Sequence, residues 1–301
     1  MNIGYKTSRM LGCNVYISEG SKLALLEQLK GIASSSSGTA LVHTFIDKPY
    51  NRTGFTLVSP VPQQLARTAV QLARAALAAI DLRLHSASHP RLGVVDHISC
   101  HPLGAGAVLS SATEAARLIG SQLGEGELAV PVFLYGSAHK NQQSLADIRR
   151  ACGYFKGSKQ GAFHGASGII IPPGLQPDYG PRHLDPSRGM ATVGAVPFVV
   201  NYNVLLRTDD MQLSRQIARA ISSRGGGLPS VEAMALPHEG GVEIACNLLD
   251  AATSSAEAVG AAVQEHARKH GIVVGDAYMT GKTPEELCTL AEQILAAQSK
   301  E

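Results

Sequence analysis

The sequence lacks paired cysteines and a strong excess of either charge. Its few cysteines are far apart and form no Cys-x-x-C pair: Cys13, Cys100, Cys152, Cys246 and Cys288. An odd, scattered set is typical of reduced thiols, so we expect a cytosol-like, cytoplasmic compartment and no disulfide framework. The net charge is only +2. No bulk electrostatic attraction to nucleic acid is therefore expected.

Long apolar runs are also missing. The longest near-apolar stretches, such as residues 68–80, contain polar or charged residues and fall short of the roughly 20 residues that a membrane-spanning helix needs. The first eleven residues have no apolar segment of the kind found in secretory signals. We therefore expect no membrane partner, while a role of this short stretch in organelle targeting stays open.

The sequence does contain one pattern of elements that occurs in both halves. The first half predicts a strand, a helix, two strands, a helix and a strand, at residues 12–18, 21–32, 39–47, 53–59, 63–84 and 92–100. The second half predicts the same order at residues 196–206, 211–224, 230–236, 241–249, 256–270 and 272–279. The order β-α-β-β-α-β is that of the ferredoxin-like unit. We expect an α/β protein of the α+β type, with two tandem ferredoxin-like subdomains (residues 1–193 and 194–301) and helices packed on mixed or antiparallel sheets.

Further elements extend this pattern. A helix at residues 112–123 and a strand at residues 130–135 follow the first unit, and a helix at residues 283–297 ends the chain. Thr283 and Pro284 suit the N-cap and first turn of that last helix.

The most informative segment is the nine residues from His89 to His97, His-Pro-Arg-Leu-Gly-Val-Val-Asp-His. Pro90 fixes its own φ and pushes His89 toward an extended backbone, just before the apolar run 92–95. Imidazole titrates near neutral pH, so a rigidly held ring at the mouth of a strand suits general acid–base chemistry. A loop histidine without a chemical role is the alternative.

Asn51 and Arg52 lie at a predicted turn between two strands. The planar guanidinium of Arg52 suits a carboxylate ligand. Alternatively, the segment is a plain hairpin in which Asn51 satisfies the backbone of the turn.

Residues 153–194 are rich in glycine and proline and show no clean periodicity. Such a segment is either a linker or a ligand-binding loop. Five basic residues lie on and just after a predicted helix that leads into this segment: Lys140, Arg149, Arg150, Lys156 and Lys159. They form either a solvated helix face or an attractive surface for a polyanionic tail.

Asp96, His97 and His101, together with His89, raise the question of a metal site. On a strand, however, His97 and His101 would lie about 13 Å apart, too far to hold one ion. No second cluster supplies the missing ligands, so we expect no metal.

The segment from His85 to Asp96, together with Asn51-Arg52-Thr53 and Asp178-Tyr179-Gly180-Pro181, resembles the formiminotransferase domain of glutamate formiminotransferase and formimidoyltransferase-cyclodeaminase. The resemblance runs from Cys13 to about Leu290. It is stronger to plant-type, stand-alone members, which share the long form of the His89 segment and Arg-Gly-Gly-Gly-Leu-Pro-Ser at residues 224–230.

This resemblance implies a folate-dependent one-carbon transferase. Its members move a formimino or formyl group from an amino-acid donor, such as N-formiminoglutamate, to tetrahydrofolate, which is a substrate held between the subdomains. It implies that His89 is the general base, kept neutral with the help of Arg91. It also implies that the ligands are bound by Asn51, Arg52, Arg91, Asp178, Tyr179, Gly180 and Pro181. A small amino-acid donor and folate are then the partners, and the resemblance implies a homodimer.

Two features depart from the family pattern. Val15 and Tyr16 stand where the family has Pro and Asn, and Asp47 alone replaces a pair of acidic residues before Asn51. The retained His89 favours the transferase. The altered donor side favours the alternative, a reduced-folate-binding protein without transfer activity and with a regulatory or storage role; an interaction scaffold is a third option.

Overall fold

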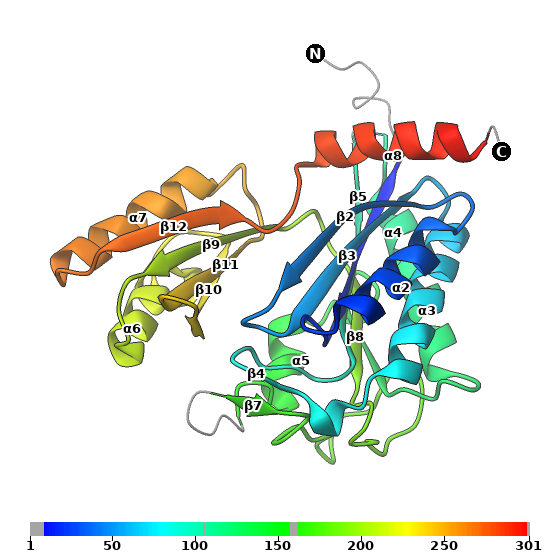
Figure 1. The fold of residues 1–301 in the computed structure, drawn as a ribbon, viewed down its shortest axis with the longest axis horizontal. Coiled ribbons are helices and arrows are strands. Elements are labelled where there is room, and N and C mark those ends of the chain that lie inside the picture. Colours follow the sequence, from blue (N-terminus) through cyan, green and yellow to red (C-terminus); the bar gives the residue numbers. More distant parts are fainter. Residues whose placement is uncertain (1–8, 105, 157–161, 300–301) are drawn as a thin grey trace. The chain divides into compact units, whose positions relative to one another are not determined.

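The computed structural model describes residues 9–104, 106–156 and 162–299, and the chain forms two compact units (Figure 1). The first unit combines residues 1–196 with 283–301, and the second comprises residues 197–282. The class is α+β, as the sequence predicts. The boundary expected after residue 193 falls inside strand β8 (Ala191–Ala195), and the last helix belongs to the first unit.

One mixed sheet organises the first unit, with the spatial strand order β2-β3-β1-β5-β8-β6. In chain order its strands are β1 (Leu11–Ile17), β2 (Ala40–Asp47), β3 (Arg52–Ser59), β5 (Val95–Pro102), β6 (Val132–Gly136) and β8. Strand β1 runs antiparallel to β3 and β5, whereas β5, β8 and β6 are parallel. The first four of these strands follow the β-α-β-β-α-β order along the chain.

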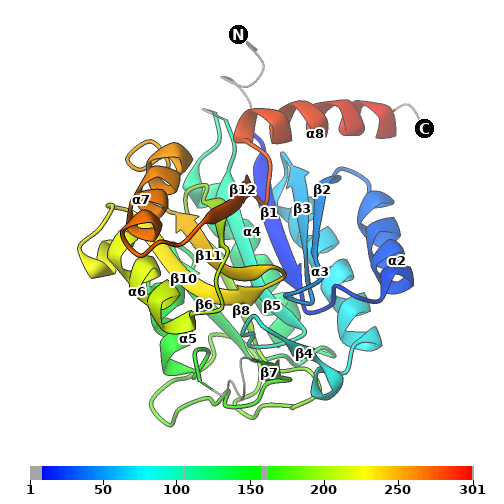
Figure 2. The ribbon, with the colours of Figure 1, turned by 60° about the vertical axis from the view of Figure 1, so that its left-hand side comes forward.

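Three helices cover one face of this sheet, as Figures 1 and 2 show. They are α2 (Leu23–Ser34), α3 (Pro62–Ala79) and α4 (Leu109–Gly124). In α3, the buried residues Leu65, Ala69, Leu72 and Ala76 recur at helical spacing and form an apolar stripe. This stripe packs on the sheet, and the main core of the unit lies between them.

The opposite face of the sheet carries a second, smaller core. Along β6, Val132 and Leu134 face the helices, while Phe133 and Tyr135 alternate to the other side. Helix α5 (Leu145–Ala151) packs there through Ile148. A helix at this place was expected from the sequence, whereas strand β8 was not. Two short elements, η1 (Leu82–Leu84) and β4 (Ser86–Ala87), precede the His89 segment, and β4 pairs with β7 (Phe163–His164).

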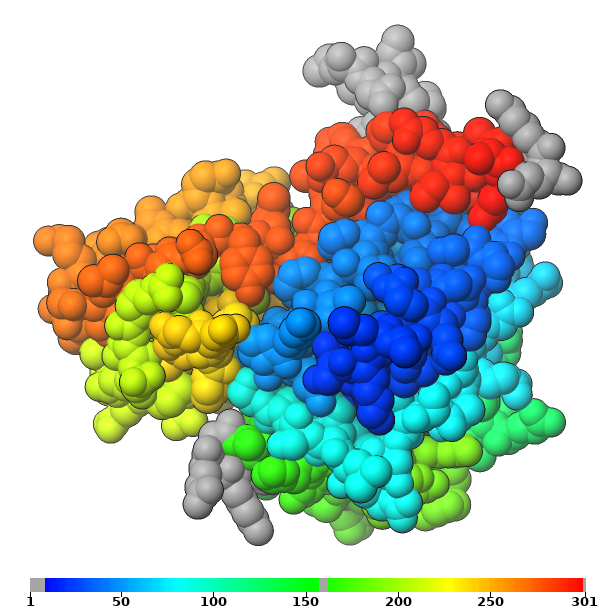
Figure 3. Space-filling view, viewed as in Figure 1, coloured from blue at the N-terminus to red at the C-terminus, as the bar shows by residue number. Residues whose placement is uncertain are grey.

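Helix α8 (Pro284–Gln298) returns to the first unit and packs against β2 and β3 (Figure 3). The predicted N-cap is confirmed: Glu286 N–H donates to Thr283 Oγ1, and the Glu286 carboxylate accepts from Thr283 N–H. At the other end, Gln298 Nε2 donates to the carbonyls of Ser36 and Thr39.

The second unit has the order β-α-β-β-α-β as well. Its elements are β9 (Val200–Leu206), α6 (Met211–Ile221), β10 (Val231–His238), β11 (Gly241–Leu248), α7 (Ala256–Lys269) and β12 (Val274–Met279). The strand order is β10-β11-β9-β12, with antiparallel neighbours. After α6 and the short η2 (Ser223–Gly225), Gly226 adopts φ +84°, the left-handed conformation expected of a helix stop.

Among the helices of the described ranges, none is long and apolar enough to cross a membrane.

Gly93 provides a test of this packing. A Cβ at Gly93 would lie 2.3 Å from the Met190 carbonyl oxygen and 2.9 Å from that of Arg188, so the backbone would have to shift. We expect Gly93→Ala to lower the free energy of unfolding by about 1–3 kcal/mol, the usual cost of overpacking. Denaturant titration measures this change.

Gly31→Ala is the matched control. Gly31 lies within α2, and a Cβ there would meet no atom within 4 Å. Because alanine favours helix over glycine, this variant should gain roughly 0.5–1 kcal/mol. Equal stability of the two variants would contradict a close approach at Gly93.

Candidate active site

The His89 segment contains a buried turn that two side-chain hydrogen bonds fix in place. The Ser18 hydroxyl at the end of β1 donates to the Gly93 carbonyl oxygen (2.7 Å). Within the turn, Leu92 N–H donates to Asp96 Oδ1 (2.6 Å). The expected strand therefore starts only at Val95, because residues 92–94 are taken up by these contacts and by a bridge between Gly93 and Gly189.

His89 is buried, with 8 % of its surface exposed. Its Nδ1 lies 2.6 Å from the Pro90 carbonyl oxygen, and its Nε2 lies 3.3 Å from Arg52 Nη1. A carbonyl oxygen only accepts and a guanidinium only donates, so the neutral ring carries its hydrogen on Nδ1 and its lone pair on Nε2. His89 Nε2 is therefore a base whose lone pair faces Arg52.

The surroundings keep this ring uncharged. Burial lowers the pKa of His89 well below its ordinary value, and the positive charges of Arg52 and Arg91 lower it further. The expected contribution of Arg91 to a neutral imidazole agrees with this result.

Arg91 itself is engaged by the protein. Its Nη2 donates to the carbonyl oxygens of Tyr50 (2.9 Å) and His89 (2.8 Å), and its Nη1 donates to that of Asn51 (3.3 Å). The guanidinium thus joins the turn before β3 to the His89 turn. This geometry gives Arg91 a positioning role, and its contact with a ligand stays a prediction.

Asn51 has a similar role. It adopts φ 44°, a left-handed conformation that asparagine tolerates in turns. Its Oδ1 accepts from Gly20 N–H (2.8 Å), and its Nδ2 donates to the Ser86 carbonyl oxygen (3.3 Å). Its side chain therefore satisfies backbone groups of two other segments instead of the backbone of its own turn, and its contact with a ligand stays a prediction.

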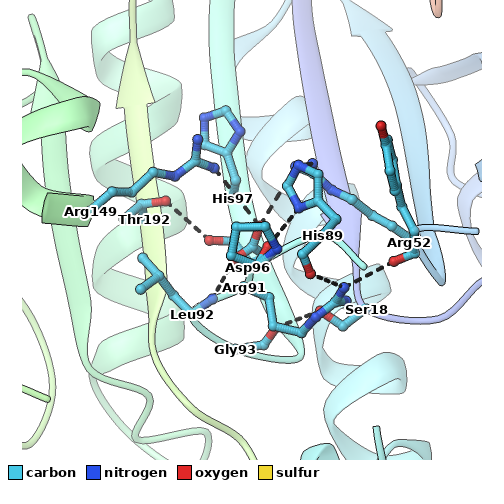
Figure 4. A network of polar contacts seen from close by, with 12 residues as sticks. Ser18, Arg52, His89, Arg91, Leu92, Gly93, Asp96, His97, Arg149 and Thr192 are labelled. Carbon is cyan, nitrogen blue, oxygen red and sulfur yellow. Dashed lines mark hydrogen bonds and ion pairs between the residues drawn. The ribbon is translucent and has the colours of Figure 1, made fainter. Parts of the chain in front are cut away.

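Asp96 occupies the centre of the cluster (Figure 4). It is 1 % exposed, and its Oδ2 lies 3.6 Å from Arg52 Nη2 and 3.8 Å from Arg149 Nη2. The Thr192 hydroxyl donates to the Asp96 carbonyl oxygen (3.1 Å). One buried carboxylate thus meets two guanidinium groups that come from β3 and from α5. With Arg91, the positive groups around His89 outnumber this carboxylate.

A row of rings lies beside this cluster. The Tyr16 and His97 rings stack with centroids 5.5 Å apart, and His97 Nε2 lies 2.7 Å from the Tyr135 hydroxyl. Arg52 Cζ lies 4.1 Å from the centre of the Tyr16 ring, a cation–π contact. Tyr16, which departs from the family pattern, therefore holds the guanidinium that meets His89.

The segment 178–181 lies elsewhere on the first unit. Asp178 Oδ2 accepts from Leu134 N–H (2.8 Å), and Tyr179 pairs with Val132 of the edge strand β6. Gly180 adopts φ +84°, and Pro181 follows it. No hydrogen bond or ion pair of the described residues joins this segment to His89, Arg52 or Asp96. The segment closes the edge of the sheet, and its folate contacts stay a prediction.

The five basic residues around the predicted ligand loop do not form one surface. Lys140 and Lys156 are exposed, and Arg150 pairs with Asp147 on the surface. Arg149 is instead directed into the active-site cluster. Lys159 lies outside the described residues. Within the described ranges, no group of three or more His, Cys, Asp or Glu side chains is placed to hold a metal ion.

Two members of the site, Asp96 and Arg149, are not among the ligand-binding residues predicted from the sequence. Asp96 was considered only as a metal ligand, and Arg149 only as part of a surface. The sequence does contain one signal for Asp96: it directly follows the apolar run 92–95. A carboxylate in a buried strand requires polar partners, so its position predicts charged neighbours.

The fold and the cluster define an α+β protein with a buried, neutral imidazole among guanidinium groups. The family model described as "Formiminotransferase domain, N-terminal subdomain" matches residues 10–196, and the chain belongs to this family.

Three relatives place the chain more closely. It is 41 % identical to a formiminotransferase cyclodeaminase-like protein of Arabidopsis thaliana, over 92 % of this chain and 95 % of the relative. It is 27 % identical to a glutamate formimidoyltransferase of Streptococcus pyogenes, over 97 % of this chain and 95 % of the relative. It is 28 % identical to the formimidoyltransferase-cyclodeaminase of Gallus gallus, over 97 % of this chain but 53 % of that protein.

The buried histidines predict how stability depends on pH. Burial lowers the pKa of His85 and of His101 to about 4, and that of His89 and His97 well below the ordinary value. Below pH 6.5 these histidines bind protons in the unfolded chain but stay neutral in the folded chain. The free energy of unfolding should therefore fall as the pH drops from 6.5 toward 4, by up to about 1.4 kcal/mol per pH unit for each histidine.

Chemical denaturation at a series of pH values tests this, with His85→Gln as the comparison. That variant should show a shallower dependence because one such histidine is gone. A wild-type stability that stays constant between pH 7 and 5 would refute the assignment.

Proposed function

We propose that this protein is a folate-dependent transferase that moves a formimino or formyl group from an amino-acid donor such as N-formiminoglutamate to tetrahydrofolate. The single observation that carries the proposal is the His89 ring, fixed as a neutral base with its lone pair on Nε2. Family membership and the names of the relatives support the same reaction.

In this reaction folate N5 forms a bond to the transferred carbon. The bond between that carbon and the amino-acid nitrogen breaks, and the N5 proton passes to the leaving nitrogen. His89 Nε2 accepts the proton and then returns it. To give up its proton, folate N5–H must replace the Arg52 N–H that faces His89 Nε2 in this structure. The planar group of Arg52 then becomes available to a carboxylate of the donor or of the folate.

The alternative that the sequence left open is a reduced-folate-binding protein without transfer activity. The intact His89, Arg52 and Asp96 geometry supports the transferase instead, because mere binding needs no neutral base beside guanidinium groups. The resemblance adds folate contacts by residues 178–181 and a homodimer to the proposal, and the scattered cysteines add a cytoplasmic location.

The main test is His89→Ala. We expect the transfer rate to fall at least about a hundredfold, the usual order for the loss of a general base, while folate affinity stays nearly unchanged. Steady-state assays and calorimetry with tetrahydrofolate measure the two quantities. His270→Ala is the control, because His270 is exposed at the end of α7 and should leave the rate within about twofold. A His89 variant with normal turnover would show that the ring is only structural.

The pH dependence gives a second test. The active form of His89 is the neutral one, and its pKa lies well below 6.5. The neutral form therefore persists as the pH falls through 6.5, so kcat/KM should stay level from pH 8 to 6. An ordinary histidine base would lose half its activity near pH 6.5. Such a loss in the wild type would contradict the proposed state of His89.

A further inference from the structure

Tyr154 is a buried residue next to the site that the reaction described above does not use. It follows α5 and packs in the smaller core with Phe133, Ile148 and Cys152, with 1 % of its surface exposed. Its hydroxyl oxygen has no hydrogen-bond partner among the residues that the structure describes. Buried phenols nearly always have such a partner, because an unsatisfied polar group is costly to bury.

The ring of Tyr154 packs against groups of the site. The ring meets the His89 ring edge-on, with centroids 6.3 Å apart and planes at 78°. Arg149 Cζ lies 4.5 Å from the centre of the Tyr154 ring. Burial raises the pKa of the phenol, while the charges of Arg149, Asp96, Arg52 and Arg91 also act on it. The Tyr154 side chain therefore packs beside His89 and Arg149, and at neutral pH its phenol keeps its hydrogen.

A protonated phenol whose ring contacts the base, and whose hydroxyl has no partner among the described residues, can donate a hydrogen bond to a reacting group. We propose that Tyr154 is a catalytic residue whose hydroxyl donates to the heteroatom of the transferred one-carbon group, the formimino nitrogen or formyl oxygen. This inference rests on the proposed transfer reaction. The heteroatom would supply the partner that the Tyr154 hydroxyl lacks.

The electron balance of the step explains why a donor is needed there. When the N5 lone pair forms its bond to the carbon, the electron pair of the C=N or C=O bond moves onto the heteroatom. Tyr154 stabilises that pair by its hydrogen bond and keeps its own proton, while His89 holds the proton from N5. When the pair returns, the bond to the amino-acid nitrogen breaks and His89 protonates that nitrogen. A fixed donor that strengthens as charge develops accelerates the step.

Tyr154→Phe removes only the oxygen atom and tests the proposal by two opposite effects. Turnover should fall about a hundredfold with KM changed less than about threefold, the order seen when one such donor is removed. The unfolding temperature should rise by about 2–4 °C, because an unsatisfied buried hydroxyl is gone. Lower turnover with a lower unfolding temperature would instead mark a structural tyrosine and overturn the proposal.

Tyr202→Phe is the matched control. Tyr202 lies on β9 of the second unit, and the same single atom is lost. Its turnover and unfolding temperature should match the wild type. Wild-type turnover in Tyr154→Phe would overturn the role of Tyr154 while leaving the transferase in place.

A binding measurement separates failure of the two proposals. Calorimetry with 5-formyl-tetrahydrofolate, whose formyl oxygen would accept from Tyr154, should show affinity about three- to tenfold lower in Tyr154→Phe than in the wild type. If the wild type transfers no one-carbon group from any donor tested, the proposed function fails, and Tyr154 as a catalytic residue fails with it. Reduced affinity of the variant would then still identify the hydroxyl as a ligand contact, whereas equal affinity would reject that too.

Discussion

The Asp96 carboxylate is the interaction on which the rest of the site depends. One of its oxygens closes the turn by accepting from Leu92 N–H, and the other lies between Arg52 and Arg149. The two arginines come from segments far apart in the sequence, β3 and α5, and both add positive charge around His89. A buried charge of this kind is stabilised only while its partners stay in position. Loss of Asp96 would therefore leave two guanidinium groups without their shared counter-charge.

The site also shows how a basic environment can keep a base neutral. Arginine remains charged under all ordinary conditions, so the guanidinium groups set a fixed positive field. The pKa of a histidine in that field is lowered, so its ring is neutral at ordinary pH and able to accept a proton. His85 has two incompatible hydrogen-bond partners at one nitrogen. Its Nε2 lies 3.0 Å from Arg91 Nη1, which donates, and 3.0 Å from the Asn51 carbonyl oxygen, which accepts. One nitrogen cannot accept from the first and donate to the second at once, so one of these contacts is unsatisfied in either tautomer.

Much of this arrangement could be predicted from local patterns. Helix α3 and the strands on either side of it follow from periodicity, and His89 follows from the stiff Pro90 turn. Strand β8 could not be predicted, because a short Ala-Thr-Val-Gly-Ala run has little β signature and gains its stability only from pairing with β5 and β6. Arg149 was misjudged for a related reason. A charged residue on a helix is usually solvated, and only the tertiary fold turns this one toward Asp96.

The position of β8 has a consequence for the order in which the protein folds. Strand β8 lies between β5 and β6, although β6 comes before it in the chain. Strand β6 can join the sheet only after the long connection through residues 137–190 has brought β8 back. Such non-local pairing is slow, because the entropy of closing the connection is lost before any contact compensates for it. Arg149 and Tyr154 lie on that same connection, so the cluster around Asp96 is completed only after β8 has paired, and a chain that has formed only its first strands and helices still lacks it.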